Sequence, residues 1–370
     1  MSRLVLVGAG HAHALVLDAW RRQPVPGIEL VLVAPEKHAP YSGMIPGWLG
    51  GRYQFDETLV AFDDLCVAAG TQFVTGALTR LDPDRQTLEL SDGQQLSYDW
   101  LSLNVGSTLR PPVQQDPVLA ERVLAMRPLA TLQSRYEAWL GQWQAAQDNE
   151  PLRLTAVGAG AAGIESLLCV KHRLQTLRPD KVVKAQLITR GTALLPGFSD
   201  WARIIAAAYL HDAGVKVHLE TPWSGTIAHQ SDLIIWATGA EPHAWQTDPA
   251  TRGNLQTDAA GFIVVNDHLQ SVSHANVFAA GDCAALPTSV SKAGVYAVRM
   301  GDTLSHNLKA AISGQALSPF TKTGKALALL NTADGSAIAA WGRLAWHGKW
   351  VMRWKDRIDR RFISRLRCGT

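Results

Sequence analysis

The sequence has few cysteines and no long apolar run. Its four cysteines, Cys66, Cys169, Cys283 and Cys368, stand far apart, without a Cys-x-x-Cys pair or the spacing of metal ligands. This pattern predicts neither a disulfide relay nor a metal site. No apolar stretch reaches the length of a membrane span, and the first residues lack the pattern of a signal peptide. We therefore expect a cytoplasmic protein, with attachment to the cytosolic face of the inner membrane as the alternative.

An excess of charge of one sign is also missing. The formal net charge is +3 over 370 residues, of which 47% are hydrophobic. This is the composition of a globular chain with room for two or three domains. A nearly balanced charge does not suit a nucleic-acid-binding protein, so we expect no nucleic-acid partner.

Glycine is abundant where two apolar runs end. Residues 8–13 read Gly-Ala-Gly-His-Ala-His after the run 4–7, and residues 158–163 read Gly-Ala-Gly-Ala-Ala-Gly after the run 154–157. In such a turn the first glycine permits the bend and the second lets the backbone approach a pyrophosphate. The third allows close helix–strand packing, and the helix N-terminus supplies N–H groups. A glycine turn without a ligand is the alternative to either match alone, but two matches predict two dinucleotide sites.

The first turn departs from the pattern at its third glycine, where His13 stands. Close packing of helix against strand must be relaxed there, and the rings of His11 and His13 are candidates to reach a flavin or a substrate. Further along, the strand 276–280 ends in Gly281 and Asp282. A carboxylate at a strand end accepts hydrogen bonds from the hydroxyls of a ribityl chain. This element, downstream of two phosphate turns, predicts FAD in the first site.

Other flavin-side candidates follow from their position. An acidic residue usually binds the adenosine ribose at the end of the second strand. Ala34 stands in that place, and Glu36 is the substitute candidate. The loop 41–47 is too rich in glycine and proline for regular structure, so we expect it to lie against the flavin ring. The predicted flavin-side residues are Gly8, Gly10, His11, Ala12, His13, Ala34, Glu36, Gly43, Met44, Gly106, Gly281 and Asp282.

The second site is predicted from strands at 153–157, 185–189 and 215–219. Its predicted dinucleotide contacts are Gly158, Gly160, Gly163 and Gly239. Where an acidic residue would select NADH, the sequence has Thr189 followed by Arg190. An arginine can pair with a 2′-phosphate, which favours NADPH and leaves NADH open.

The C-terminal segment has a separate character. Apolar side chains recur there every four residues among basic ones, which predicts an amphipathic helix. The apolar positions are Trp346, Trp350, Trp354, Ile358, Phe362 and Leu366. A basic helix with tryptophans is typical of a membrane-surface anchor. The alternative is that the stripe packs on the flavin domain or on a second subunit, forming a homodimer.

At this point the motifs resemble a known family. The order of the two turns, residues 237–239 (Ala-Thr-Gly) and Gly281-Asp282 resembles the FAD-dependent pyridine nucleotide-disulfide oxidoreductase superfamily. Within it, the chain looks most like the branch of type II NADH dehydrogenases and sulfide:quinone oxidoreductases. Residues 10–13, 41–47, 292–299 and 355–360 resemble the NADH-dehydrogenase-like flavoproteins found fused ahead of selenide, water dikinase. The resemblance covers nearly the whole chain.

The resemblance implies an α/β fold with two Rossmann-like dinucleotide-binding domains, the glutathione-reductase-like FAD/NAD(P)-binding fold, plus a C-terminal segment with an amphipathic helix. The expected FAD-binding domain is discontinuous and covers residues 1–112 and 262–320. Residues 113–261 form the expected NAD(P)H-binding domain. Residues 321–370 form the expected interface or membrane-surface segment.

The resemblance also implies the chemistry. NADH or NADPH would pass a hydride to FAD, and a quinone or another small acceptor would take the electrons. Lys292, at the start of the next helix, is implied to favour reduced flavin, with a solvated lysine as the alternative. Glu165 is implied to lie near the flavin–nicotinamide contact, with a carboxylate at a helix start as the alternative.

Two other functions stay open at the level of the sequence. A sulfide- or selenium-compound oxidoreductase would need Cys169 or Cys283 as a nucleophile near the flavin. A flavin-binding redox sensor would need no rapid turnover. The lack of a cysteine pair favours direct transfer from the flavin to an acceptor.

Overall fold

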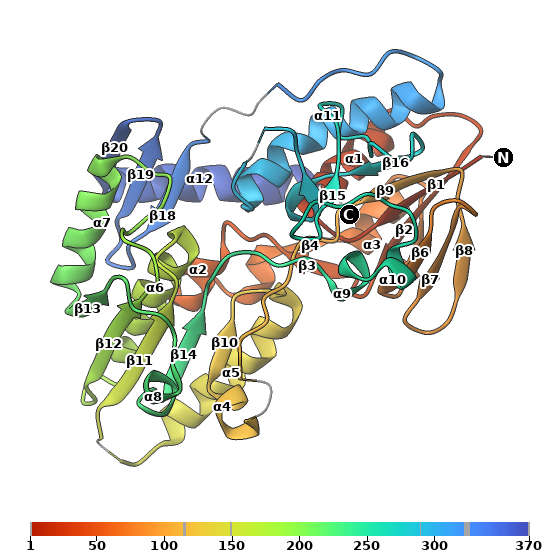
Figure 1. Cartoon of the computed structure of the whole chain (residues 1–370). Helices are drawn as coiled ribbons and strands as arrows, with labels where there is room; N and C mark the ends of the chain where they lie inside the picture. Colours follow the sequence, from red (N-terminus) through yellow and green to blue (C-terminus); the bar gives the residue numbers. More distant parts are fainter. Residues whose placement is uncertain (1, 114–115, 149, 289, 322–325, 369–370) are drawn as a thin grey trace.

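Two parallel five-stranded sheets form the body of the molecule (Figure 1). The computed structural model describes residues 2–113, 116–148, 150–288, 290–321 and 326–368. The first sheet has the order β16-β9-β1-β2-β5 and the second β10-β14-β11-β12-β13. The strands of the first sheet are β1 (Ser2–Val7), β2 (Ile28–Ala34), β5 (Gln72–Thr75), β9 (Trp100–Leu103) and β16 (Val277–Ala279). The strands of the second are β10 (Val123–Ala125), β11 (Leu152–Val157), β12 (Val183–Ile188), β13 (Val215–His218) and β14 (Leu233–Trp236).

The central strands are mostly apolar because each is covered on both faces, as is usual in parallel sheets. In β1, Leu4 and Leu6 belong to one buried cluster, while Val5 and Val7 belong to another. On the first of these faces, α1 (His11–Arg22) packs beside α11 (Gly294–Ile312). The other face is covered by an antiparallel sheet of β6 (Leu78–Asp82), β7 (Thr87–Leu90) and β8 (Gln95–Ser97). The predicted α/β fold with two dinucleotide-binding units is confirmed.

The second sheet is accompanied by three longer helices and two short ones. These are α5 (Leu129–Ala145), α6 (Ala161–Leu177), α7 (Asp200–Asp212), α4 (Pro117–Glu121) and α8 (Gly225–His229). The remaining short elements connect the larger ones. They are β3 (His38–Pro40), β4 (Leu59–Ala61), β15 (Ile263–Val264), β17 (Ala284–Ala285), α2 (Ile45–Leu49), α3 (Phe62–Ala68), α9 (Ala244–Thr247), α10 (Pro249–Arg252), η1 (Phe55–Thr58) and η2 (Gly281–Cys283).

The segment 41–47 is only partly a loop, which corrects the expectation that it has no regular structure. The helix α2 begins within it, at Ile45. Pro46 stands in the first turn, where a proline is compatible with a helix because its missing N–H has no partner within the helix. Glycine and proline therefore shorten this helix without preventing it.

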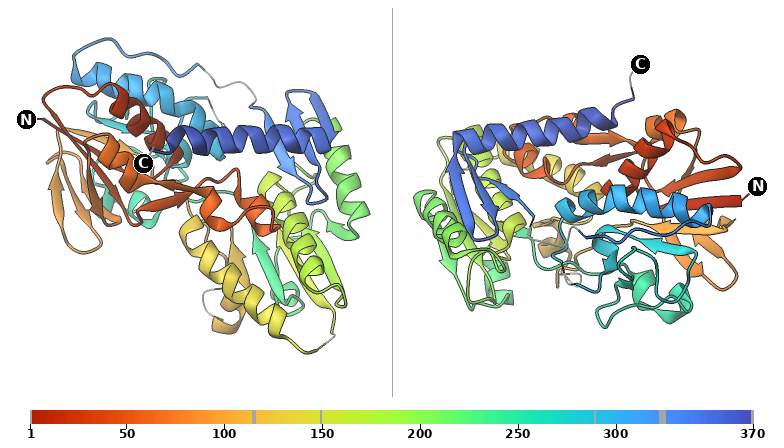
Figure 2. Two further views of the ribbon diagram at one scale, coloured as in Figure 1. Left: turned by 180° about the vertical axis from the view of Figure 1, so that it is seen from behind. Right: turned by 90° about the horizontal axis from the view of Figure 1, so that it is seen from above.

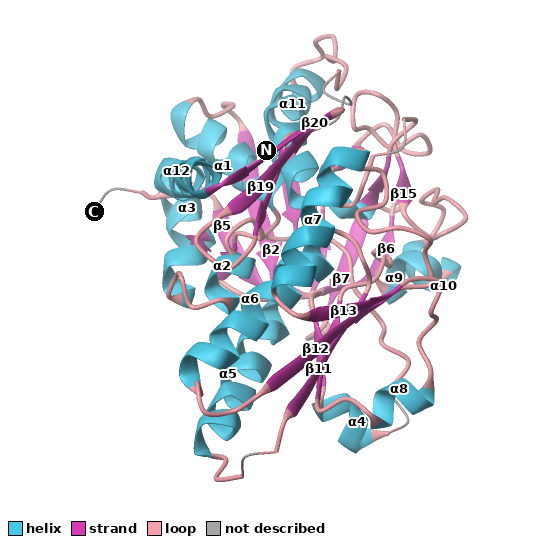
Figure 3. Ribbon diagram, turned by 90° about the vertical axis from the view of Figure 1, so that its left-hand side faces the viewer, coloured by secondary structure: helices cyan, strands magenta, loops and turns pink. Residues whose placement is uncertain are grey.

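The chain ends in an antiparallel sheet followed by one long helix. The sheet is formed by β18 (Ala328–Asn331), β19 (Ala337–Trp341) and β20 (Leu344–Gly348), and the helix is α12 (Lys349–Leu366). Figure 2 shows α12 running from this sheet across to the N-terminal part of the chain. Figure 3 shows α7 beside β19 and β20.

The amphipathic stripe predicted as one helix is divided between a strand and a helix. Trp346 lies in β20, where it pairs with Ala339 of β19. Gly348, with φ +128, ends the strand and precedes α12. The four-residue period alone could not show this break, because residues four apart lie on the same face of a strand as well as of a helix.

Candidate active site

The first glycine turn is shaped by one side chain from a neighbouring strand. Gly8 has φ +102, and a Cβ there would lie 2.5 Å from the Asn104 backbone oxygen. A Cβ on Gly10 would collide with the Asn104 side chain. Asn104 Oδ1 accepts hydrogen bonds from the N–H groups of Ala12 and His13 at 3.1 and 3.2 Å. Asn104 thus caps the start of α1, just after β9.

His13 replaces the third glycine by making two hydrogen bonds in the interior. Its side chain is fully buried. Nδ1 lies 2.7 Å from the Gly8 carbonyl oxygen and Nε2 lies 2.8 Å from Ser102 Oγ. Burial lowers the pKa of His13 to about 4, so the ring is neutral at pH 7, donating to the carbonyl and accepting from the hydroxyl. The structure gives each ring nitrogen a protein partner, and no face of the ring is open to a ligand.

His11 takes part in a cluster that joins four segments. His11 Nε2 lies 2.9 Å from Ser42 Oγ and accepts a hydrogen bond from the Ser42 N–H at 3.3 Å. Its ring is 5.1 Å from that of Tyr41, which stacks on Phe362 of α12 at 4.4 Å. A Cβ on Gly294, the first residue of α11, would collide with Ser42 Oγ. Burial lowers the pKa of His11 to about 4.

The predicted ribityl-binding carboxylate lies at the end of β16. Gly281 has φ +73, and a Cβ there would lie 2.6 Å from Asn104 Nδ2. Ser107 Oγ donates to Asp282 Oδ2 at 3.2 Å, and the Arg127 guanidinium pairs with the same oxygen at 3.1 Å. No sequence motif marked Asn104, Ser107 or Arg127. The strand order β16-β9-β1 brings Asn104, Ser107 and Asp282 together at the carboxyl end of the first sheet, where ligands of this fold bind. Arg127 reaches this place from the second sheet.

Lys292 lies ahead of α11, whose N-cap is Ala293. Its ammonium group donates to the Ala284 carbonyl and lies 3.9 Å from the centre of the Phe262 ring. Burial lowers the pKa of Lys292. The side chain is therefore held on β17 and Phe262 and is not a freely solvated lysine.

The other predicted flavin-side residues differ in their surroundings. Ala34 at the end of β2 and Met44 are buried, whereas Glu36 is exposed in the turn beyond β2. Gly106 follows β9 with φ +72 and has no atom near its missing Cβ. The Gly43 carbonyl oxygen accepts a hydrogen bond from a side chain of α12.

That side chain belongs to Lys355, which also pairs with Asp359 Oδ2 at 2.7 Å. Both are buried, and burial raises the pKa of Asp359. Glu165, in the first turns of α6, accepts a hydrogen bond from the Asn331 N–H at 2.7 Å. Burial raises the pKa of Glu165 to about 7, while Lys355 opposes this rise. Titratable groups of α6 and α12 are thus gathered beside the segment 41–47.

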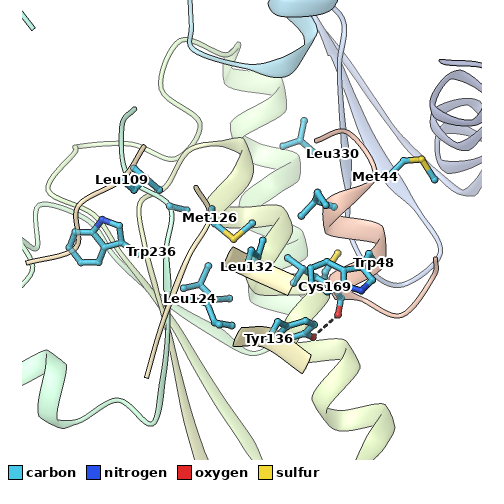
Figure 4. Packing of buried hydrophobic residues seen from close by; sticks show 14 of the residues in the cluster. Met44, Trp48, Leu109, Leu124, Met126, Leu132, Tyr136, Cys169, Trp236 and Leu330 are labelled. Carbon is cyan, nitrogen blue, oxygen red and sulfur yellow. Dashed lines mark hydrogen bonds between the residues drawn. The ribbon is translucent and has the colours of Figure 1, made fainter. Parts of the chain in front are cut away.

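Apolar packing holds these segments in place. One buried cluster joins residues of several segments (Figure 4). It contains Met44 and Trp48, Tyr136 of α5, Cys169 of α6 and Leu330 of β18. The hydroxyl of Tyr136 donates to the Leu49 carbonyl oxygen at 2.6 Å.

The second glycine turn has the regular form. Gly158 has φ +113, and a Cβ there would collide with the Ala237 carbonyl oxygen. A Cβ on Gly163 would collide with the Gly158 carbonyl oxygen. In the first turn, the corresponding atom is the Gly8 carbonyl oxygen, which accepts a hydrogen bond from His13. Gly160 is the N-cap of α6, and both Gly160 and Gly239 have open space at the missing Cβ. This turn therefore needs glycine at its third position for contact with the backbone.

The end of β12 carries no carboxylate at the position that selects NADH. Thr189 Oγ1 accepts a hydrogen bond from the Gly191 N–H at 3.1 Å, and the Thr189 N–H donates to the His218 carbonyl oxygen. Arg190 between them is exposed. The Thr189 hydroxyl is engaged in the turn, and a guanidinium stands at its surface.

The thiols are buried or half-buried, and two of them lie near the site, with Cys283 beside Asp282 and Cys169 in the same helix as Glu165. All four cysteines are among the described residues, and none forms a disulfide. Burial raises the pKa of Cys283 to about 11 and holds that of Cys169 well above its usual value. A thiol that stays protonated is a poor nucleophile, so nothing here favours a sulfur-based reaction. Within the described ranges, no group of three or more His, Cys, Asp or Glu side chains is arranged to hold a metal ion.

The C-terminal helix has two faces of different character. Val351, Met352, Ile363 and Leu366 are buried against the protein. Along the opposite side lies a row that we call the tryptophan face. It consists of Trp346 of β20 and of Trp350, Trp354 and Ile358 of α12, which are 37–50% exposed. The predicted stripe is thus exposed from Trp346 to Ile358, whereas its last residue, Leu366, packs on the protein. In the part of the chain that the structure describes, no helix is apolar and long enough to pass through a bilayer.

Comparison with known proteins agrees with this layout. Residues 2–301 match the family model described as pyridine nucleotide-disulphide oxidoreductase. An alternative NAD(P)H-ubiquinone oxidoreductase C1 of Arabidopsis thaliana is 25% identical over 362 residues, covering 86% of this chain and 69% of that protein. Two solved structures share the fold. The sulfide:quinone oxidoreductase of Aquifex aeolicus has a TM-score of 0.77 at 14% identity, covering 99% of this chain and 92% of that one. NDH2 of Plasmodium falciparum in complex with NADH has a TM-score of 0.74 at 13% sequence identity, covering 97% of this chain and 97% of that one.

Proposed function

Because the chain belongs to the pyridine nucleotide-disulphide oxidoreductase family, it is an FAD-dependent NAD(P)H oxidoreductase, and we propose that it delivers electrons to a quinone at a membrane surface. The observation that carries this proposal is that α12 contacts the protein on one side and exposes tryptophans on the other. Its inner side contacts the flavin-side segment through Lys355 and the Gly43 carbonyl, while its outer side exposes Trp350 and Trp354. An acceptor dissolved in a bilayer would thus be met next to the flavin site.

The first site fits FAD, which family members bind. Gly8 and Gly10 let Asn104 lie against the start of α1, and a first-turn N–H group such as that of His11 has no intrahelical partner and can donate to a pyrophosphate. The interactions of Asp282 with described residues all reach Oδ2, which leaves Oδ1 as an acceptor for a ribityl hydroxyl. When bound, FAD takes two electrons from the nicotinamide and passes them to the acceptor.

The chain's own residues orient the cofactors and exclude water. The backbone around Gly43 and Met44 is held by Lys355, and Tyr41 and Phe362 cover its outer side. Glu165 titrates near pH 7, because burial disfavours its carboxylate and raises its pKa to about 7. We assign Glu165 the role of exchanging a proton near the nicotinamide contact, with Lys355 and Asp359 setting its local charge.

The second site, in this proposal, prefers NADPH. Gly158 and Gly160 at the start of α6 receive the pyrophosphate, and Gly163 and Gly239 permit close approach of the backbone. The exposed guanidinium of Arg190 pairs with the 2′-phosphate. Residues 1–112 with 262–320, 113–261 and 321–370 then act as the flavin, nicotinamide and membrane-facing parts.

The surroundings of the tryptophan face suit an anionic bilayer. Exposed basic side chains lie along α12 at Lys349, Arg353, Arg357 and Arg361. Tryptophan rings settle at the interface between headgroups and acyl chains, while basic side chains attract anionic lipid. The sheet and helix thus form a surface that can lie on the membrane without crossing it.

The test combines binding with turnover. The purified protein is sedimented with vesicles of phosphatidylcholine containing phosphatidylglycerol, and NADPH oxidation is measured with a quinone dissolved in the same vesicles. Replacing Trp350 and Trp354 together by serine should lower vesicle binding about tenfold or more, because their half-exposed rings no longer bury apolar area. Turnover with the vesicle-borne quinone should fall in parallel, whereas turnover with a water-soluble dye should stay unchanged.

A matched control removes exposed apolar side chains elsewhere. Val67 and Val118 are 82% and 62% exposed, and the double serine variant should bind vesicles like the natural protein. Equal binding by the tryptophan variant and this control would reject the membrane surface. Failure of NADPH and NADH to bleach the bound flavin would reject the proposed reaction itself.

A further inference from the structure

One arginine joins the two cofactor-binding units. Arg127 follows β10, a strand of the second sheet. Its guanidinium nevertheless lies among residues of the flavin unit, 2.8 Å from Ser107 Oγ, 2.8 Å from the Lys292 carbonyl oxygen and 3.1 Å from Asp282 Oδ2. A planar fork of donors is thus shared by a hydroxyl, a backbone carbonyl and a carboxylate.

The backbone that carries Arg127 is firmly held. The preceding residue, Met126, donates its N–H to the Trp236 carbonyl oxygen at 3.0 Å, next to β14. Its side chain is buried in one cluster with Leu109 and Trp236 (Figure 4). The arginine itself is 26% exposed and Asp282 15% exposed. Partial burial strengthens this ion pair relative to a solvated one.

The positive charges of Lys292 and Arg127 lie in different places relative to the start of α11. Lys292 turns its ammonium group away, toward the Ala284 carbonyl and the Phe262 ring. Arg127 instead contacts the Lys292 carbonyl oxygen, two residues before α11 begins at Gly294. Its positive charge therefore stands between Asp282 and the start of α11, where the helix dipole is positive as well.

We propose that Arg127 is a positioning residue for FAD. It engages Oδ2 of Asp282, so that Oδ1 remains available to a ribityl hydroxyl. It also places a fixed positive charge at the start of α11, which favours the additional negative charge of the reduced flavin. Arg127 thereby takes the electrostatic role that the sequence suggested for Lys292. This inference rests on the proposed function only in that FAD occupies the first site.

The midpoint potential of bound FAD tests this assignment. It is measured by spectroelectrochemistry on the purified holoprotein, with the FAD content of each sample determined first. Arg127→Met should shift the two-electron equilibrium at least tenfold toward oxidised flavin, which lowers the potential by about 30 mV. Arg122→Met is the matched control, because Arg122 precedes the same strand at its other end and donates to the Ser231 carbonyl. It should leave the potential unchanged.

A second variant separates charge from geometry. Arg127→Lys keeps the charge but loses the fork, so its potential should stay closer to that of the natural protein while FAD dissociates faster. An Arg127→Met protein that retains FAD with an unchanged potential would overturn the proposal. If that variant does not fold, an Arg127→Lys protein with the natural potential and the natural FAD dissociation rate would overturn it. A natural protein whose FAD is not reduced by NADPH or NADH would instead reject the proposed function, whatever Arg127 does.

Discussion

His13 should make the fold sensitive to mild acid. It is fully buried, and its two ring nitrogens bond to the Gly8 carbonyl oxygen and to Ser102 Oγ. A protonated ring could donate twice but could not accept from the serine hydroxyl. Protonation would also place an unpaired charge beside the strand β1. The neutral ring is therefore the form that the folded chain accepts.

The size and sign of the effect follow from the pKa. Burial lowers the pKa of His13 from 6.5 to about 4 in the folded chain, whereas in the unfolded chain it keeps its usual value. Below pH 6.5 the unfolded chain takes up a proton that the folded chain refuses, so acid favours unfolding. The stabilisation is fully present above pH 6.5 and is lost as the pH falls toward 4. The free energy of unfolding should drop by about 1.4 kcal/mol per pH unit, or about 3 kcal/mol in all.

The assay compares the natural protein with His13→Gln in urea titrations between about pH 7.5 and about pH 4.5. Glutamine does not titrate, so the variant should lose this slope, although it should be about 1–3 kcal/mol less stable at neutral pH because one polar partner is left unpaired. His211→Gln serves as the control, since the His211 side chain is 89% exposed. Identical pH slopes for the natural protein and His13→Gln would refute the assigned role.

Three further outcomes are expected. Because burial raises the pKa of Glu165 to about 7, the rate at which NADPH bleaches the flavin should show an ionisation near pH 7 that is absent in Glu165→Gln; stopped-flow traces with the same pH profile for both proteins would contradict this. Arg190→Ala should lower kcat/KM for NADPH about tenfold to hundredfold, the worth of a charge-assisted contact, and leave that for NADH nearly unchanged; equal losses would remove the 2′-phosphate contact. Asn104→Ala removes the acceptor for two N–H groups of α1, so thermal unfolding should show a loss of about 1–3 kcal/mol together with faster release of FAD; unaltered melting would show that water replaces the cap.

The elements that the sequence predicted well are those with local signals. A strand followed by a glycine turn and a helix can be recognised within about fifteen residues, and both turns, at Gly8 and Gly158, were found in this way. Asp282 was found because a Gly-Asp pair follows an apolar strand.

The residues that sequence reasoning missed act across long separations. Asn104 caps a helix that begins at His11, and Arg127 reaches Asp282 from the other sheet. An asparagine after one strand and an arginine after another have no local signature, because their partners become neighbours only in the folded chain. The polar residue Asn104 at the carboxyl end of a central strand was the available signal. His13 was visible as a departure, but its partner Ser102 was not.

The structure also changes how the C-terminal helix can be studied. Deleting the chain from about residue 345 would remove the tryptophan face, but it would also expose the apolar surface that Val351 and Met352 cover. It would free the Gly43 carbonyl from Lys355, and Asp18 from its ion pair with Arg365. Lost vesicle binding in such a truncation could then arise from a damaged flavin site. In the proposed arrangement, membrane anchoring and the flavin site depend on the same helix, so only changes confined to its outer row can separate them. The FAD content of the Trp350 and Trp354 variant must therefore be measured. If the variant retains FAD, a loss of vesicle binding can be assigned to the removed tryptophan rings.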